Sequence, residues 1–419
     1  MKLDTRAMRH LTAEDWKVLA AVEQGTKNHE LVPLPLIERF SRLKGGSSLV
    51  SKCISTLAKS SLIAKMKEAK YDGYRLTYGG LDYLALHSHA QKNHIYSVGS
   101  RVGVGKESDI MIVADHTGAQ QILKIHRLGR ISFRTVKTNR DYLRKNPSNS
   151  SWMYLSTLAA RKEFLFLSAL HSAGIPVPTP IAHSRHTIIM SLVDAPPLRQ
   201  ISSVPDPASL YASLIELYLR LAKHGLIHGD YNEFNILIRE DVSTNPDDDD
   251  GTETITLTPV VIDFPQMVSM EHVNAEMYFD RDVNCIKTFF ERRFHFKATT
   301  PGPFYKDVRK TVGRDGFQRL DAALEASGIT KKMAKDLEAA IRQHEEEKKQ
   351  NPSAYESGDG DEEDDDEDDD EDEDEEDEEE QQQQEGAGDK EGEPQIIIGS
   401  KAPLGSEEGL EKLSINDKT

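Results

Sequence analysis

Cysteine is nearly absent from this sequence: Cys53 and Cys285 are the two copies in 419 residues, and they form no CxxC motif. Two distant cysteines cannot build a disulfide scaffold or a cysteine zinc site, and they suit a reducing compartment. Apolar runs approaching the roughly 18 residues of a membrane span are lacking, and the start of the chain has no apolar signal core. We therefore expect a soluble, intracellular protein with no membrane partner. Its expected location is the cytoplasm, with shuttling through the nucleus.

The acidic net charge of -19 comes from one segment. Residues 361–380 are twenty consecutive Asp and Glu residues, and the rest of the chain has a formal charge of +1. The acidity therefore does not exclude an anionic ligand for the folded part. Residues 349–419 cannot bury enough apolar surface to offset chain entropy, so we expect a disordered acidic tail.

The first 92 residues predict a winged helix-turn-helix domain. Thr12 and Asp15 have the spacing of a capping box at the start of a helix, and Asp72-Gly73 marks the turn of a later β-hairpin. Helices are expected at residues 12–25, 35–43 and 47–63. Three helices followed by a hairpin is the order of a winged helix.

The next part of the chain predicts two lobes, so that the whole is an α+β protein. The first, at 93–193, should contain a strand-rich meander at 95–126, a helix at 152–173 and a buried strand at 187–193. The second, at 194–348, should contain helices at 206–225, 280–294 and 333–348 and two apolar runs at 235–238 and 255–262. Between these runs we expect the insert 241–254 to be a solvated loop.

A glycine-rich stretch lies between two of the predicted strands. It contains Gly103, Gly105, Lys106, Glu107 and Ser108. Glycines let backbone N–H groups approach phosphate oxygens, while a Lys and a Ser add a charge and a hydroxyl. The P-loop pattern fails, because Glu follows the Lys and the stretch joins two strands. An ordinary hairpin turn explains the glycines equally well.

Two further segments carry candidate catalytic residues. One lies just before a predicted strand, and the other lies at the end of a predicted strand. His228-Gly229-Asp230 leads to Asn235 with the spacing of a kinase catalytic loop, in which Asp serves the attacking hydroxyl and Asn binds magnesium. Asp263 ends a buried strand, where a kinase places its second metal ligand. Polar residues of an ordinary turn are the alternative for the first segment.

Lys124 is a lone charge in the apolar strand Ile122–Ile125. An unpaired buried ammonium is costly, so we expect an ion pair with Glu163 on the 152–173 helix. A Lys on the solvent face of an edge strand is the alternative. The strand that ends at Met190 should lead into the linker between the lobes, so Ser191 and Val193 are expected to meet adenine.

The order of these signals resembles the RIO family of atypical protein kinases. The resemblance rests on Gly-Lys-Glu-Ser at 105–108, His-Gly-Asp-Tyr-Asn-Glu-Phe-Asn at 228–235 and Asp-Phe-Pro at 263–265. A winged-helix N-terminus is typical of one subgroup of that family. The resemblance covers about residues 1–345, and the insert 241–254 departs from it.

The resemblance implies an ATP- and Mg²⁺-dependent serine/threonine kinase or ATPase that assists late maturation of the small ribosomal subunit. Asp230 would be the catalytic carboxylate, Asn235 and Asp263 the magnesium ligands, and Asp263 also the carrier of an aspartyl-phosphate. Little chain separates Asp263 from the next predicted helix and no Ala-Pro-Glu follows, so peptide phosphorylation is less expected than ATP hydrolysis.

Basic segments indicate a nucleic-acid partner, and the resemblance implies that this partner is ribosomal RNA with its assembly factors. Residues 1–95 carry a net charge of +6, and the stretch 128–151, expected to be a flexible loop, carries +5. Ordinary solvated surfaces have similar compositions. An RNA-binding scaffold that uses its kinase-like domain only as a nucleotide sensor is therefore the second interpretation.

Overall fold

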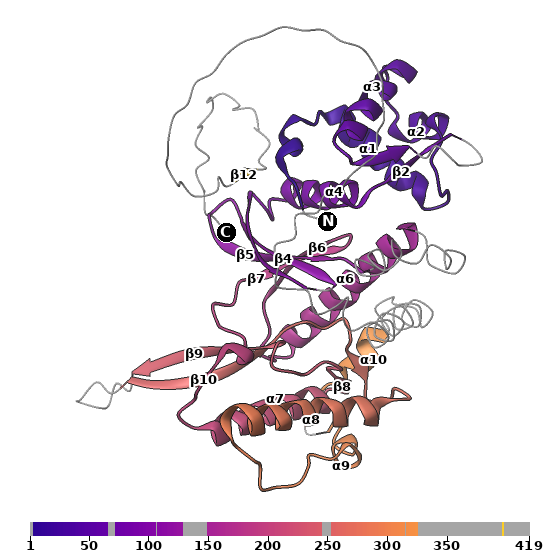
Figure 1. The fold of residues 1–419 in the computed structure, drawn as a ribbon. Coiled ribbons are helices and arrows are strands. Elements are labelled where there is room, and N and C mark those ends of the chain that lie inside the picture. Colours follow the sequence, from indigo (N-terminus) through magenta and orange to yellow (C-terminus); the bar gives the residue numbers. More distant parts are fainter. Residues whose placement is uncertain are drawn as a thin grey trace, which may run out of the picture.

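The computed structural model describes residues 3–65, 72–105, 107–128, 149–244, 253–314, 316–325 and 396–397. In Figure 1 a small helical unit lies on one face of a twisted sheet, and a second helical lobe lies beyond the other face. The expected helix at 333–348 and nearly all of the expected tail lie outside the described residues. Among the described helices, none combines the length and the apolar character that crossing a bilayer requires.

The N-terminal unit is a winged helix, as predicted. It consists of η1 (Arg6–His10), α1 (Ala13–Thr26), α2 (Leu34–Ser41), α3 (Gly46–Lys59) and the antiparallel hairpin of β1 (Ile63–Lys65) and β2 (Tyr74–Leu76). The predicted capping box is present: Thr12 accepts a hydrogen bond from the Asp15 backbone N–H, and the Asp15 carboxylate accepts one from that of Thr12. The reciprocal cap fixes where α1 begins.

Helix α4 (Tyr78–Gln91) was not predicted. It joins the winged helix to the sheet and packs against β6. Nearly every residue from Tyr78 to Leu86 is buried, so α4 has no polar face and shows no amphipathic period in the sequence. Four of its side chains belong to one hydrophobic core that includes both the winged helix and one face of the sheet, namely Leu81, Tyr83, Leu84 and Leu86.

The first kinase-like lobe is an antiparallel sheet of order β3-β4-β5-β7-β6, with β12 (Ile396–Ile397) paired to the outer edge of β3. The strands are β3 (Ser97–Val104), β4 (Ser108–Ala114), β5 (Gln120–His126), β6 (Pro180–Ser184) and β7 (Thr187–Ser191). Side chains alternate along β5, so Leu123 and Ile125 face the winged-helix core while Ile122 packs against the core of the other lobe. The sheet thus separates two cores.

Helix α6 (Asn149–Ser172) packs against β5, β6 and β7 and ends before Gly174, whose φ is +70°. The expected loop 128–151 is wrong at both ends. Leu128 is buried, and its backbone N–H donates to the Ser156 hydroxyl, while 149–151 form the first residues of α6. Asn and Ser suit a helix start as well as a loop, which is why the sequence pattern did not place this boundary. Residues 129–148 lie outside the described part.

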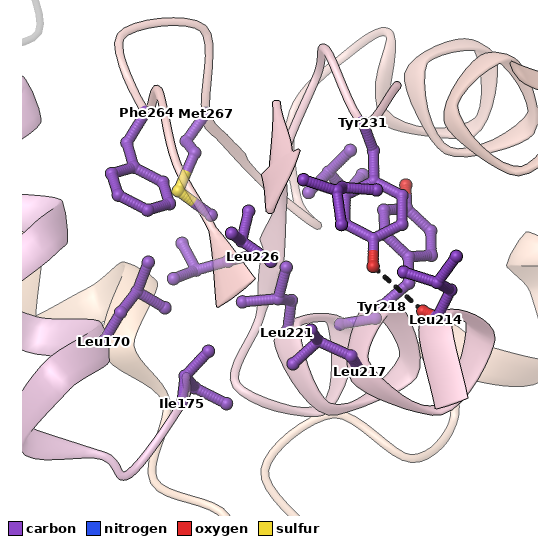
Figure 2. Close-up of a cluster of buried hydrophobic side chains, with 14 of the residues drawn as sticks. Leu170, Ile175, Leu214, Leu217, Tyr218, Leu221, Leu226, Tyr231, Phe264 and Met267 are labelled. Carbon is purple, nitrogen blue, oxygen red and sulfur yellow. Dashed lines mark hydrogen bonds between the residues drawn. The ribbon is translucent and has the colours of Figure 1, made fainter. Parts of the chain in front are cut away.

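The second lobe is mostly helical. Its elements are η3 (Leu198–Gln200), α7 (Pro207–Lys223), β8 (Leu226–Ile227), β9 (Ile236–Thr244), β10 (Glu253–Val261), β11 (Val268–Ser269), α8 (Ala275–Phe294), α9 (Tyr305–Arg309) and α10 (Leu320–Glu325). As predicted, Asp206 caps α7 by accepting from the N–H groups of Ala208 and Ser209. Apolar residues of α7, β8 and the following loops pack together in Figure 2, with the Tyr231 hydroxyl donating to the Leu214 carbonyl.

The two ends of the insert 241–254 are strands and not the solvated loop that the sequence suggested, while residues 245–252 lie outside the described part. Residues 241–244 continue β9 and 253–254 begin β10, in unbroken antiparallel register from Ile236↔Val261 to Thr244↔Glu253. The cross-strand pair Val242 and Ile255 shows why: β-branched residues face each other and extend the ladder despite the polar residues around them. The hairpin projects from the body of the lobe in Figure 1.

Candidate active site

Lys124 lies at the centre of the interface between the two lobes. Its Nζ lies 2.8 Å from Glu163 Oε1 on α6 and 2.7 Å from Asp263 Oδ1 beyond β10. The expected Lys124–Glu163 pair is thus present. Because Lys124 is 6% exposed, it is not the solvent-facing Lys of the alternative interpretation.

The charges of this cluster stabilise one another. Burial alone would lower the pKa of Lys124, but Asp263 and Glu163 outweigh burial and raise that pKa above its usual range. Burial would raise the pKa of Glu163, but Lys124 and His126 outweigh it and lower that pKa to about 2. His126 lies two residues beyond Lys124 on the same face of β5, and its Nε2 is 2.9 Å from Glu163 Oε2.

The glycine-rich stretch forms the turn between β3 and β4. Gly103 pairs with Ile110, and Gly105 donates its N–H to the Ser108 carbonyl at 2.7 Å. A Cβ on Gly105 would lie 3.1 Å from the Ser108 carbonyl oxygen, so a side chain fits poorly there. The Glu107 carbonyl accepts from the backbone N–H of Arg127. Lys106 lies outside the described residues.

The strand expected to meet adenine runs beside Lys124. Met190 is buried and pairs with Ile122, which places it next to the Lys124 strand. The Ser191 N–H already donates to the Thr179 carbonyl at 2.9 Å, so it is not free for adenine. The Val193 carbonyl accepts from the Ala195 N–H. Contact between this segment and adenine stays a prediction.

Two amides hold the carboxylate of Asp230. Asn232 Nδ2 donates to Asp230 Oδ1 at 2.8 Å, and Asn235 Nδ2 donates to Oδ2 at 2.9 Å. The amide nitrogen of Asn235 is therefore used, and its oxygen is the atom that it can offer to a cation. Asp230 and Asn235, five residues apart, converge as the catalytic-loop spacing predicts.

Gly229 has the backbone conformation that explains why Gly stands where most kinases have Arg. Its φ is +79°, and a Cβ would lie 2.6 Å from the Gln266 carbonyl oxygen. A side chain at this position would therefore be both strained and obstructed. The Gly229 carbonyl accepts a hydrogen bond from Arg281, and its N–H donates to Asp282 at 2.8 Å.

Asp282 fixes the backbone of the catalytic loop through hydrogen bonds. This buried carboxylate of α8 accepts from the N–H groups of Gly229 and Tyr231 and from the Tyr218 hydroxyl. Burial raises the pKa of Asp282 to about 6, against the lowering effect of these hydrogen bonds. The sequence reasoning missed Asp282, because an Asp within a charged helix reads as a surface residue until the fold is known.

Asp263 is held in an unusual position. Its φ is +70°, its side chain is 41% exposed, and the preceding residue, Ile262, donates its N–H to the Asn235 carbonyl at 3.0 Å. After it, Phe264 is buried and meets the ring of His228 edge to face. Buried His228 has its pKa lowered by burial to about 4, so the ring is neutral near pH 7.

Magnesium fits this donor set. The Asp263 carboxylate and the Asn235 amide are hard oxygen donors on neighbouring segments, and Mg²⁺ in phosphate-transfer sites takes one or two such protein ligands together with substrate phosphates. Among the described residues there is no cluster of three or more His, Cys, Asp or Glu that could hold a metal by itself. A site completed by phosphate oxygens is the arrangement that these residues support.

Comparison with family models matches both parts of the chain. A model described as "RIO domain" matches residues 109–246 and 254–301, and one described as "Rio2, N-terminal" matches 8–92. The unmatched residues between the two parts of the first match are 247–253, so this central part of the expected insert 241–254 departs from the family pattern, whereas residues 241–246 and 254 are matched.

Comparison with individual proteins gives the same picture. The chain is 50% identical over 338 residues to the serine/threonine-protein kinase rio2 of Schizosaccharomyces pombe, covering 81% of this chain and 92% of that one. Identity is 44% to RIO2 of Saccharomyces cerevisiae, with 81% of each covered. A crystal structure of the Chaetomium thermophilum Rio2 kinase-ADP/Mg²⁺-phosphoaspartate complex is 75% identical, with a TM-score of 0.76, covering 83% of this chain and 100% of that one.

Proposed function

The chain belongs to the Rio2 serine/threonine-protein kinases of the RIO family, and on that premise we propose that its Asp263 carries the phosphoryl group as a covalent intermediate. It is a kinase-type enzyme that uses ATP and Mg²⁺. The observation that carries the proposal is the position of Asp263, which is part-exposed at the lobe interface and in direct contact with Lys124. The phosphoaspartate complex of the Chaetomium thermophilum enzyme supports it.

The proposed transfer has two steps. A carboxylate oxygen of Asp263 attacks the γ-phosphorus of ATP, the bond from that phosphorus to the bridging oxygen breaks, and ADP leaves with the bond electrons. Water then attacks the phosphorus of the acyl phosphate while Asp230 accepts its proton, releasing phosphate and the Asp263 carboxylate. Asn235 and Asp263 would hold magnesium together with the phosphates, and the ion would supply neutralisation of charge there.

Lys124 has a role in each state of this cycle. In the structure it neutralises Asp263 directly, at 2.7 Å. With nucleotide bound, its ammonium would contact the phosphates while Glu163 continues to hold it, which frees Asp263 for attack. Pairing of Lys124 with Glu163 is therefore the fixed part of the site, and its contact with Asp263 the exchangeable part.

The test is labelling with ATP that carries a radioactive γ-phosphate. We expect label that hydroxylamine removes, that Asp263→Asn abolishes, and that accumulates in Asp230→Asn because hydrolysis of the acyl phosphate slows. Labelled serine alone, with no hydroxylamine-sensitive fraction, would contradict the covalent route. Single-turnover ATP hydrolysis by the same variants separates loss of chemistry from loss of labelling.

We further propose that this activity serves late maturation of the small ribosomal subunit, with precursor RNA and assembly factors as partners, in the cytoplasm with shuttling through the nucleus. The net charge of +6 on residues 1–95 and +5 on 128–151 supports contact with RNA phosphates, and the acidic run 361–380 would compete with RNA for these surfaces.

A salt titration of RNA affinity tests these partners. It compares the full chain, a chain ending at Asn351 and a chain with the six Lys and Arg residues of 128–151 neutralised. We expect truncation to raise the affinity and neutralisation to flatten the salt dependence. Superimposable curves would leave the loop and the tail without this role, whatever the outcome of the labelling experiment.

A further inference from the structure

A buried ion cluster joins the winged-helix unit to the glycine-rich turn. The guanidinium of Arg127 forms a bidentate pair with Asp82 of α4, with both N–O distances 2.7 Å, and its Nε lies 3.1 Å from Asp109 Oδ2 at the start of β4. His186 Nε2 lies 2.7 Å from Asp82 Oδ1. The side chains of Arg127, Asp82 and Asp109 are 1%, 4% and 4% exposed.

Strand alternation puts this cluster on the face of the sheet opposite the nucleotide site. Lys124 and His126 point toward Glu163 on α6, whereas Leu123 and Ile125 belong to the winged-helix core. Arg127 follows Leu123 and Ile125 at the same two-residue spacing. It therefore lies on their face of the sheet, opposite to the face of Lys124. Asp109 pairs with Ile125 in the β4–β5 ladder and shares that face.

Arg127 also holds the end of the glycine-rich turn by two routes. Its backbone N–H donates to the Glu107 carbonyl at 2.6 Å, and its side chain reaches Asp109, so the residues on both sides of Ser108 are fixed to it. A planar guanidinium with five donors can reach Asp109 and still form a bidentate pair with Asp82, a geometry that a Lys ammonium does not offer. One side chain therefore connects α4 to the turn.

The cluster is not the sole contact that docks the winged helix on the sheet. One continuous hydrophobic core already joins it to the sheet, and Arg185 forms a second, half-buried pair with Glu23 of α1. Buried ion clusters are costly to assemble and are weak contributors to stability compared with apolar packing. The cluster is one of several contacts that dock the winged helix, and it is also bonded to the glycine-rich turn. We therefore infer that it fixes the position of this turn.

We propose that Arg127 is a positioning residue through which α4 of the winged-helix unit sets the shape of the glycine-rich turn and thereby the affinity for ATP. Because Asp82 and Asp109 bind the same guanidinium, a displacement of α4 is passed to the turn. Binding of a ligand to the winged helix that moves α4 then changes nucleotide affinity, and nucleotide changes the affinity for that ligand by the same factor.

The test uses the full chain with Asp82→Asn, Asp109→Asn and the control Glu23→Gln, which weakens the other pair between the winged helix and the sheet. Affinity is measured by equilibrium binding of Mg²⁺·ADP, so the result does not depend on the covalent route through Asp263. We expect both cluster variants to weaken binding about tenfold, because the turn is no longer preorganised, and the control to stay within about twofold.

Thermal unfolding of the same proteins separates positioning from stability. Asp109→Asn keeps the Arg127–Asp82 pair, so its melting temperature should stay near that of the unchanged chain while its affinity falls. If Asp82→Asn does not fold, Asp109→Asn decides the question. Unchanged affinity in Asp109→Asn, or an equal loss of affinity in Glu23→Gln, would overturn the proposal.

Discussion

Lys162 Nζ donates a hydrogen bond of 2.7 Å to the backbone carbonyl of Pro265, two residues beyond Asp263. Lys162 precedes Glu163 on α6, and its ammonium also lies 5.6 Å from the centroid of the Phe166 ring. The helix that orients Lys124 through Glu163 therefore also holds the segment that carries Asp263.

This relationship predicts a selective loss of turnover in Lys162→Met. Without the hydrogen bond, the segment after Asp263 is less well fixed, and we expect single-turnover hydrolysis to slow about tenfold while Mg²⁺·ADP affinity is unchanged. Lys162→Arg keeps a donor and should recover part of the rate. Equal losses in rate and affinity would show that Lys162 acts on the fold as a whole.

Substitutions at both members of the Lys124–Glu163 pair should separate catalysis from stability. Lys124→Ala leaves the buried Glu163 carboxylate without its cation, so we expect a loss of about 3 kcal/mol in the free energy of unfolding and at least about a 100-fold loss of ATP turnover. The double variant with Glu163→Gln should recover stability without recovering turnover. Unchanged turnover of Lys124→Ala at saturating Mg²⁺ would refute its role in phosphate binding.

Asp282 predicts a pH dependence in the acid range. Burial raises the pKa of Asp282 from its ordinary value of 3.8 to about 6 in the folded chain, so the folded state binds this proton more tightly than the unfolded state. The ionised form therefore costs on the order of 3 kcal/mol of stability above pH 6, and this cost is relieved as the pH falls toward 4. Activity should fall over the same range, because protonation weakens the acceptor for the Gly229 and Tyr231 N–H groups.

Asp282→Asn should remove both effects. The variant keeps one oxygen for the catalytic loop and has no proton to gain, so the acid limb centred near pH 6 should disappear from the activity profile and from the unfolding curves. A profile that keeps this limb would assign it to another group.

Gly229 and Gly174 form a matched pair for testing the catalytic loop. Both have positive φ, at +79° and +70°, but an added Cβ would lie 2.6 Å from the Gln266 carbonyl oxygen at Gly229 and within 4 Å of nothing at Gly174. Gly174→Ala should lower the free energy of unfolding by about 1 kcal/mol. Gly229→Ala should lower it by about 1 to 3 kcal/mol more and should also reduce ATP turnover. Equal costs would mean that Gln266 moves aside freely.

The elements that the sequence predicted share strong local signals. The capping box at Thr12, the cap at Asp206 and the spacing from Asp230 to Asn235 are each set by residues within a few positions of one another. Lys124 and Glu163 could be paired because a charge in an apolar strand requires an opposite charge.

What the sequence did not reveal depends on tertiary burial. Asp282, Lys162 and Arg127 are charged residues at positions that would suit a surface, and the side-chain hydrogen bonds described for them reach partners 18 to 103 residues away. Helix α4 is buried around most of its circumference, so the amphipathic period that marks a helix is missing from it.

The β9–β10 hairpin has the candidate active-site residues at one end, and its strands extend away from them. Asn235 and Asp263 flank the end where the hairpin joins the lobe, and nine cross-strand pairs lead from there to Thr244 and Glu253. A peptide tag or fluorophore inserted between those two residues would sit a full ladder away from the site. The hairpin is therefore a suitable position for attaching a reporter, from which binding to large partners could be followed without disturbing phosphoryl transfer.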